Sequence, residues 1–237
     1  SVVDYGDLPV NPGYIEDSYK MIEEGLLPIL DGGVTPIMLG GDHSVTLPEL
    51  RAMVKTHGPV ALIHFDSHTD TGDKRFGRRY THGTPFRRAV EEELILVDHS
   101  IQAGMRGSVY SRDSLDDARN MGFDLVTAVE AQEQGIDELV RRIRDRVGDA
   151  KAFVSFDIDF VDPAFAPGTG TPEVGGFTSS EALRVVRGLK GLNLVGFDLV
   201  EVLPQYDLSE VTALLAANLV YEFISLIALR KKLGSEG

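Results

Sequence analysis

The chain has 237 residues, 43% of them hydrophobic, so it is long enough to bury a full core as one α/β domain. Its formal net charge of −14 argues against nucleic acid or an anionic membrane as its main partner, because both would repel it. The absence of cysteine excludes disulfides and thiolate chemistry. The stretch 1–6 lacks the pattern of a signal peptide, so we expect a soluble, cytoplasmic protein.

Apolar runs of strand length alternate with amphipathic helical patterns along the chain. The expected strands are 36–39, 60–65, 100–105, 123–127, 152–158 and 194–198. The expected helices are 15–30, 47–55, 85–93, 114–121, 136–147 and 181–189. The runs 60–65 and 152–156 are continuously apolar, as in strands that are covered on both faces. The alternation predicts a single-domain, three-layer α/β/α fold with a mostly parallel sheet.

The apolar stretch 211–229 is nearly long enough to span a membrane. Asn218 and Glu222 lie in its middle, where burial in lipid is expensive. The sequence therefore favours a last helix that packs on the sheet.

Six potential metal ligands directly follow three of the expected strands. They are His43, Asp66, His68, Asp70, Asp157 and Asp159. Because parallel strands end at the same edge of a sheet, we expect these side chains to lie together. Alternating spacing in an extended segment would point the 66–70 ligands the same way, and likewise the 157–159 pair. Gly40 and Gly41 would allow a tight turn before His43.

Four carboxylates and two imidazoles without a thiolate suit Mn²⁺ or a similar ion. Such a group would repel itself unless cations neutralised it. Six ligands are too many for one catalytic ion with open positions, but they fit two ions that share carboxylates. Each short motif alone has an ordinary explanation as a turn or core residue. Their joint occurrence at three strand ends predicts a two-metal hydrolase.

Other candidate residues are less decisive. His64 could point toward the ligands, but we favour a buried histidine bonded to the backbone. His82 lies in a loop after Asp70, and position alone leaves its role open. The loop 73–79 carries the cations Lys74, Arg75, Arg78 and Arg79. It is either a solvated, flexible loop or a lid or carboxylate-recognising rim. The long Gly- and Pro-rich loop 162–176 follows a strand end, where loops are commonly functional.

Taken together, these motifs closely resemble the ureohydrolases, the binuclear manganese family of arginase and agmatinase. The matching stretches are 40–44, 66–70, 80–88, 155–159, 162–173 and 196–204. The stretches 82–86 and 168–173 look more like the agmatinase branch. The resemblance implies an arginase/deacetylase-like fold and two Mn²⁺ per chain, although Ni²⁺ and Co²⁺ accept the same ligands.

The resemblance also implies roles for individual residues. One ion would take His43, Asp66, Asp70 and Asp157. The other would take Asp66, His68, Asp157 and Asp159. His82 matches the proton-shuttling histidine, and Glu201 matches the glutamate that pairs with the guanidinium group of the substrate. Asp70 would accept a hydrogen bond from the reacting group.

The implied reaction is hydrolysis of a small guanidino compound to urea and an amine, with agmatine to putrescine as the preferred assignment. A guanidino acid such as guanidinobutyrate or guanidinopropionate is the alternative, because its carboxylate would suit Lys74, Arg78 or Arg79. A single-zinc deacetylase and an inactive regulatory subunit are the remaining possibilities. We expect a homo-oligomer, a trimer or hexamer. Residues 1–237 are expected to form one catalytic domain that lacks the first strand and substrate loop usual in the family.

Overall fold

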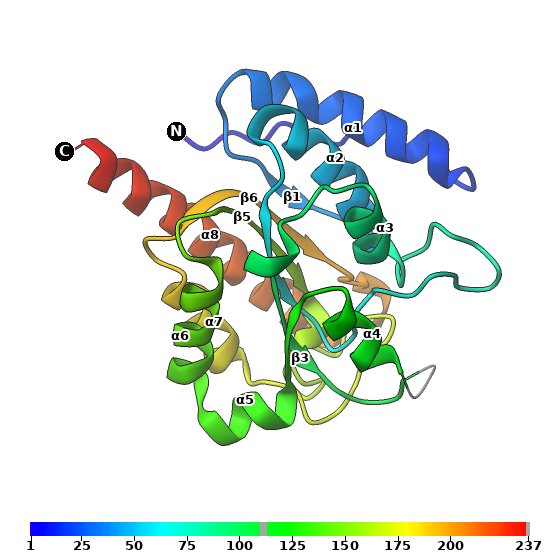
Figure 1. The fold of residues 1–237 in the computed structure, drawn as a ribbon, viewed down its shortest axis with the longest axis vertical. Helices are drawn as coiled ribbons and strands as arrows, with labels where there is room; N and C mark the ends of the chain where they lie inside the picture. Colours follow the sequence, from blue (N-terminus) through cyan, green and yellow to red (C-terminus); the bar gives the residue numbers. More distant parts are fainter. Residues whose placement is uncertain (110–112, 236–237) are drawn as a thin grey trace.

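The computed structural model describes residues 1–109 and 113–235 (Figure 1). In these residues six strands form one sheet in the order β1-β6-β5-β2-β3-β4, and every pairing between them is parallel. The strands are β1 (Ile37–Leu39), β2 (Ala61–Phe65), β3 (Ile101–Met105), β4 (Asp124–Thr127), β5 (Lys151–Asp157) and β6 (Asn193–Val200). The prediction of a three-layer α/β/α fold is confirmed, with a sheet that is parallel throughout its described pairings.

The central strands are apolar because both of their faces are covered. All five residues of β2 are buried, and so are all residues of β5 after Lys151. Ile63 of β2 is in register with Ile101 of β3 on one side and with Val154 of β5 on the other. The continuous apolar runs therefore mark the middle of the sheet, as the sequence predicts.

Two helical layers cover the sheet and form two separate apolar clusters. Buried side chains of α1, α2, α3 and α4 make one cluster, and those of α5, α6, α7 and α8 make the other. The first four helices are α1 (Ile15–Asp31), α2 (Thr46–His57), α3 (Pro85–Glu91) and α4 (Ser114–Asn120). The last four are α5 (Ala128–Gln134), α6 (Ile136–Val147), α7 (Ser179–Gly188) and α8 (Val211–Ser235). Figure 1 shows α1 and α2 on one side of the sheet, with α6 and α7 on the other.

One helix was missed in the sequence. Helix α5 is only seven residues long, too short to show a clear helical period. Its start carries a capping box in which the Thr127 side chain accepts a hydrogen bond from the Glu130 amide and the Glu130 side chain accepts one from the Thr127 amide. The same motif, between Thr178 and Glu181, begins α7.

Most of helix α8 lies in the segment Leu208–Lys232, which is long and apolar enough to cross a membrane by length and composition only. Part of this helix packs on the sheet: the Phe223 ring stacks on Phe197 of β6 at 4.8 Å between centroids. Glu222 accepts a hydrogen bond from Arg187 of α7 at 2.7 Å. These contacts agree with the expected packed helix.

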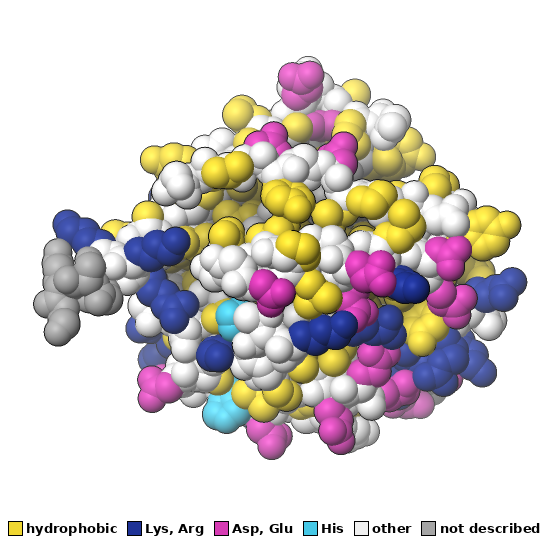
Figure 2. All heavy atoms as spheres, turned by 90° about the horizontal axis from the view of Figure 1, so that it is seen from above, with side chains coloured by type: hydrophobic (Ala, Val, Ile, Leu, Met, Phe, Trp, Pro, Cys, Tyr) yellow, Lys and Arg dark blue, Asp and Glu magenta, His cyan; other side chains and the backbone are white. Residues whose placement is uncertain are grey.

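The face on the α1 side of the sheet carries mixed side chains. Figure 2 shows hydrophobic groups gathered in the middle of this face, with acidic and basic groups around them. The N-terminal stretch contributes exposed apolar side chains, among them Val2, Val3 and Tyr5.

Candidate metal centre

The six expected ligands come from three strand ends at one edge of the sheet. His43 begins a short 3₁₀ turn after β1, Asp66 follows β2, and Asp157 ends β5. Since β5 and β2 are neighbours and β6 separates β5 from β1, the fold brings these ends within reach of one another. This arrangement is the one expected for ligand sites of open parallel sheets.

Gly40 is required by crowding rather than by turn conformation. A Cβ at this position would lie 2.6 Å from Cγ2 of Val45 and 3.0 Å from Cγ1 of Val200. Gly41 has no such neighbour within 4 Å. The expected turn is stabilised instead by Asp42, whose Oδ1 accepts a hydrogen bond from the Ser44 amide at 2.9 Å. The polypeptide can therefore pass close to β6 while presenting His43 to the site.

Three carboxylates converge on one nitrogen of the fully buried His43. Its Nδ1 lies 3.0 Å from Oδ2 of Asp66, 3.0 Å from Oδ2 of Asp70 and 3.3 Å from Oδ2 of Asp157. None of these contacts has hydrogen-bond geometry within the described residues. A single N–H could satisfy only one of the three oxygens. The donor set fits a cation, to which the nitrogen and the oxygens would all be ligands.

A second group of ligands adjoins the first. Nδ1 of His68 lies 3.1 Å from Oδ2 of Asp159 and 3.4 Å from Oδ1 of Asp66. The ligand atoms of these three residues lie within 4.8 Å of one another, as do those of His43, His64 and Asp66. Asp66 belongs to both groups. Its position fits a carboxylate that bridges two ions, and the bridging role of Asp157 stays a prediction.

The backbone conformation that brings the ligands together differs from the predicted one. Residues 66–70 are not extended but bent, and Asp70 adopts a left-handed φ of 48°. The backbone amide of His68 bonds back to Oδ1 of Asp66 at 2.5 Å. Asp159 lies in a 3₁₀ turn, where its amide bonds to Oδ1 of Asp157 at 2.8 Å. The predicted extended conformation is therefore wrong for both motifs, because turns bring these ligands together.

The carboxylates of the site oppose one another electrostatically. Burial raises the pKa of Asp159 to about 6, and the Asp66 carboxylate adds to this. Burial also raises the pKa of Asp157 well above its usual range, with Asp159 and Asp66 contributing. Burial opposes ionisation of Asp66 too, but three neighbouring histidines outweigh it and hold the pKa well below the usual range. Bound cations would favour the ionised form of these clustered carboxyl groups.

His64 is buried, as predicted, but it bonds to side chains rather than to the backbone. Its Nε2 lies 2.8 Å from Oδ2 of Asp66, and its Nδ1 lies 2.9 Å from Nε2 of Gln102. Ser155 was also missed, and its Oγ lies 2.8 Å from Nε2 of His43. The available signal was a polar residue inside a buried strand, since both Gln102 and Ser155 interrupt apolar runs.

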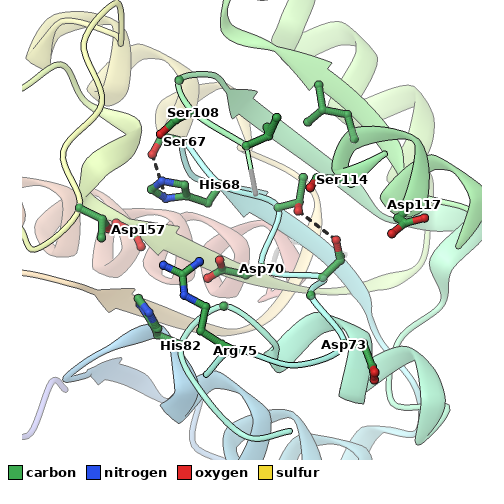
Figure 3. A pocket seen from close by; sticks show the side chains of 18 of the residues that line it. Ser67, His68, Asp70, Asp73, Arg75, His82, Ser108, Ser114, Asp117 and Asp157 are labelled. Atoms are coloured by element: carbon green, nitrogen blue, oxygen red, sulfur yellow. Dashed lines mark hydrogen bonds between the residues drawn. The ribbon is translucent and has the colours of Figure 1, made fainter. Parts of the chain in front are cut away.

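His82 and Glu201 face the same cavity as the ligands. Nδ1 of His82 lies 3.6 Å from Oε1 of Glu201, and the two side chains are 32% and 12% exposed. The cavity has a volume of about 600 Å³ and is also lined by His68, Asp70 and Asp157. Figure 3 shows the labelled side chains of His82, Asp70 and Asp157 turned toward a common space. The Glu201 carboxylate raises the pKa of His82, although burial opposes this effect.

The basic loop 73–79 borders this cavity. Lys74 and Arg75 are among its lining residues. The loop is tied to α3, since Asp73 accepts a hydrogen bond from Arg88 and Glu91 accepts one from Arg79, both at 2.9 Å. These contacts favour a positioned rim over a freely solvated loop.

Comparison with known proteins places the chain in a family. A family model described as the arginase family matches residues 1–225. A guanidinobutyrase of Pseudomonas aeruginosa is 45% identical over 227 residues, which are 96% of this chain and 71% of that protein. A mitochondrial agmatinase of Gallus gallus is 47% identical over 226 residues, 95% of this chain and 66% of that protein. The chain thus spans roughly two thirds of the length of these relatives.

A solved structure supports the same relationship. The proclavaminate amidino hydrolase of Streptomyces clavuligerus has a TM-score of 0.92 to this chain at 42% identity, covering 96% of this chain and 75% of that one. The family model, the curated relatives and the fold agree with the motifs at the strand ends. This chain belongs to the arginase family.

Proposed function

We propose that the protein is a two-metal hydrolase that cleaves a small guanidino compound into urea and an amine. The observation that carries this proposal is the placement of a carboxylate, Glu201, and a histidine, His82, in one cavity beside the His43 ligand group. When bound, two divalent cations would supply a nucleophilic water of lowered pKa and would neutralise the clustered carboxylates. Mn²⁺ is the ion we propose, with Ni²⁺ or Co²⁺ as alternatives.

Glu201 is placed to hold the guanidinium group of the substrate. Its Oε1 accepts a hydrogen bond from the backbone amide of His43 at 2.8 Å, which orients the carboxylate. The residue adopts a left-handed φ of 64°, a conformation that is uncommon for residues with a Cβ and is often found at functional sites. A charge-assisted hydrogen bond from the guanidinium to Glu201 would hold the guanidinium carbon, which is the atom attacked, in a position near Asp70.

His82 is placed to move the proton that the departing amine needs. It is half-buried, and its contact with Glu201 favours the protonated ring. The protonated ring can donate its proton to the leaving nitrogen, and the proton released by the attacking water can then restore it.

The part of the substrate beyond the guanidinium group, its tail, must lie toward the rim of the cavity. The rim carries both acidic and basic side chains, whereas the metal-ligand end of the cavity is rich in carboxylates. The acidic rim residues are already paired. Asp73 lies 2.9 Å from a guanidinium nitrogen of Arg88, and Asp117 lies 3.7 Å from one of Arg87. These carboxylates are therefore less available to a cationic tail such as the ammonium group of agmatine.

The basic residues of the rim favour a substrate tail of negative charge. Arg75 lies on a two-residue turn closed by hydrogen bonds of 2.9 Å between its backbone and that of Arg78 in both directions. Its Cδ lies 3.9 Å from the position that a Cβ on Gly83 would occupy, and Oδ1 of Asp70 lies 3.9 Å from the same point. Figure 3 shows the Arg75 side chain extending into the cavity. Together with Lys74, it supports a substrate that ends in a carboxylate, so we favour a guanidino acid. Agmatine stays a prediction as the second candidate.

The test is urea release by Mn²⁺-loaded protein from agmatine, guanidinobutyrate, guanidinopropionate and arginine, with Asp157→Ala as the control. We expect release that the control lacks, and the preferred tail identifies the substrate. Two metals bound per chain with no urea from any of the four would contradict the proposal and favour a regulatory subunit. One zinc per chain with amide cleavage would favour a deacetylase.

Three further features belong to the proposal. We propose one catalytic domain, a homo-oligomer of three or six chains, and a cytoplasmic location. The packing of α8 on the sheet supports a protein that does not use this helix to enter a membrane. Some relatives are named mitochondrial, which makes that compartment the alternative.

A further inference from the structure

A buried amide on β3 connects two parts of the candidate metal centre. Gln102 is fully buried in a strand whose other residues are apolar. Its Nε2 lies 2.7 Å from the carbonyl oxygen of Thr69 and 2.9 Å from Nδ1 of His64. Nε2 of His64 lies 2.8 Å from Oδ2 of Asp66. A continuous chain of hydrogen bonds thus runs from the 66–70 segment through β3 and back to Asp66.

The direction of each hydrogen bond in this chain follows from the chemistry of its ends. A backbone carbonyl can only accept, so the Gln102 atom facing Thr69 must be the amide nitrogen. That nitrogen has one remaining hydrogen, which it donates to Nδ1 of His64. Nδ1 therefore carries no proton, and the neutral ring is protonated on Nε2. His64 then donates to Oδ2 of Asp66.

The hydrogen bonds from Gln102 through His64 hold one oxygen of Asp66, and a backbone amide holds the other. Oδ2 of Asp66, which accepts from His64, also lies 3.0 Å from Nδ1 of His43. Oδ1 accepts from the amide of His68 at 2.5 Å. The same Gln102 amide holds the carbonyl of Thr69, the residue between the predicted ligands His68 and Asp70. One side chain therefore restrains both the shared carboxylate and the turn that presents two further ligands.

The orientation of the amide has a cost that argues for a role in the site. Oε1 of Gln102 is buried and has no hydrogen-bond partner among the described residues. An apolar residue of similar size would fill the same strand position without this loss. Packing alone gives no reason for a glutamine in this position.

We propose that Gln102 and His64 are positioning residues for the metal centre, with Gln102 selecting the His64 tautomer that holds Asp66 as a ligand. The proposal rests on the proposed function, since it requires that the site binds metal. Partners of ligands in other metal sites change metal affinity by about 10- to 100-fold when they are removed. We expect an effect of the same size here.

The test compares Gln102→Leu with the native chain. Leucine keeps the size of the side chain and removes both donors. We expect Mn²⁺ affinity, measured by competition with a chelator, to fall by about 10- to 100-fold. The metal-free variant should unfold at a somewhat lower temperature, because the Thr69 carbonyl and Nδ1 of His64 lose their donor, so the Mn²⁺ affinity of the folded variant decides the proposal. A metal-free form that unfolds earlier while Mn²⁺ affinity is unchanged would overturn the proposal in favour of a structural role.

Gln132→Leu is the matched control. The Gln132 side chain also donates to backbone carbonyls, those of Gly175 and Gly176, but it is exposed and contacts no expected ligand. Its loss should leave Mn²⁺ affinity unchanged, and an equal loss of affinity in both variants would contradict the proposal.

A second measurement does not depend on metal binding or on a variant. Nitrogen NMR of the metal-free native protein should show His64 protonated on Nε2 and unprotonated on Nδ1. Protonation on Nδ1 would overturn the proposal that Gln102 selects the tautomer of His64. Failure of the native protein to bind Mn²⁺ would be a failure of the proposed function, and the tautomer would still be decided.

Discussion

Oε1 of Glu201 joins the two halves of the site: it accepts a hydrogen bond from the backbone amide of His43 at 2.8 Å and lies 3.6 Å from Nδ1 of His82. His43 belongs to the expected metal ligands, whereas His82 belongs to the cavity in which the substrate would lie. The carboxylate that would bind the guanidinium is therefore held by the backbone of one ligand. Small displacements of β6 would move the substrate site and the His82 contact together.

The first prediction concerns His82. Replacing it with asparagine should lower kcat by about 100-fold or more, because the departing amine loses its proton donor. Metal content, measured by elemental analysis, should not change, since no ligand is removed. Loss of metal from His82→Asn would contradict the shuttle role and would instead assign the histidine to the metal centre.

The second prediction concerns the charge of Glu201. The Glu201→Gln variant keeps the size and the bond to the His43 amide but removes the negative charge. We expect kcat/KM for the preferred substrate to fall by about 10- to 100-fold, as for loss of a charge-assisted hydrogen bond. The pKa of His82 should also fall, because Glu201 is the main cause of its rise. Histidine NMR titration checks this shift, and an unchanged His82 pKa would refute the coupling.

The site is predictable from the sequence because its residues follow continuous apolar runs. Val60 to Phe65 and the run that ends at Phe156 could only be central strands, so Asp66 and Asp157 had to lie at their ends. Contacts between side chains of different strands could not be predicted in the same way. Nothing local shows that Gln102 and His64 meet, because their partnership depends on the pairing of β2 with β3.

The backbone conformation of the segments that carry the ligands could not be predicted from the neighbouring sequence either. The 66–70 motif fits an extended strand by spacing, yet the left-handed φ of Asp70 bends it. The bend is stabilised by Phe86, whose amide bonds to the Asp70 carbonyl at 3.2 Å, and by the bond between Gln102 and Thr69. Both partners are distant in sequence, so the turn could only be seen in the folded chain.

The third prediction tests the charge of the cavity rim. In Arg75→Ala, KM for guanidinobutyrate should rise by about 10-fold or more through loss of one ion pair with the substrate carboxylate, whereas KM for agmatine should not rise. Arg78→Ala is the matched control, because Arg78 lies on the same turn but does not line the cavity. Equal effects of Arg75→Ala on both substrates would remove the support for a guanidino acid.

The fourth prediction concerns a buried carboxyl pair that the proposed reaction does not use. Glu49 of α2 is 2% exposed, and burial raises its pKa well above the usual range, with the nearby Asp198 raising it further. Asp198 is itself held by hydrogen bonds from Thr46 at 2.7 Å and from the Phe156 amide at 3.2 Å. Burial and the nearby Asp198 therefore favour the protonated form of Glu49.

This proton makes stability depend on pH in a defined direction. In the unfolded chain Glu49 loses its proton near pH 4.3, whereas the folded protein retains it to higher pH. The folded state then binds more protons, so its contribution to the free energy of unfolding is complete below about pH 4.3. Above that, the contribution falls by up to about 1.4 kcal/mol per pH unit until the folded pKa is passed. Glutamine cannot ionise, so Glu49→Gln removes this loss.

We therefore expect Glu49→Gln to be more stable relative to the native chain at pH 8 than at pH 4. Urea unfolding of the metal-free protein, kept so by chelator, measures this difference without interference from metal binding. The same substitution at Glu24, whose side chain is 64% exposed, is the control and should show no such trend. A variant that loses more stability at pH 8 than at pH 4 would mean that Glu49 is ionised in the folded protein, because glutamine would then have removed a favourable charge.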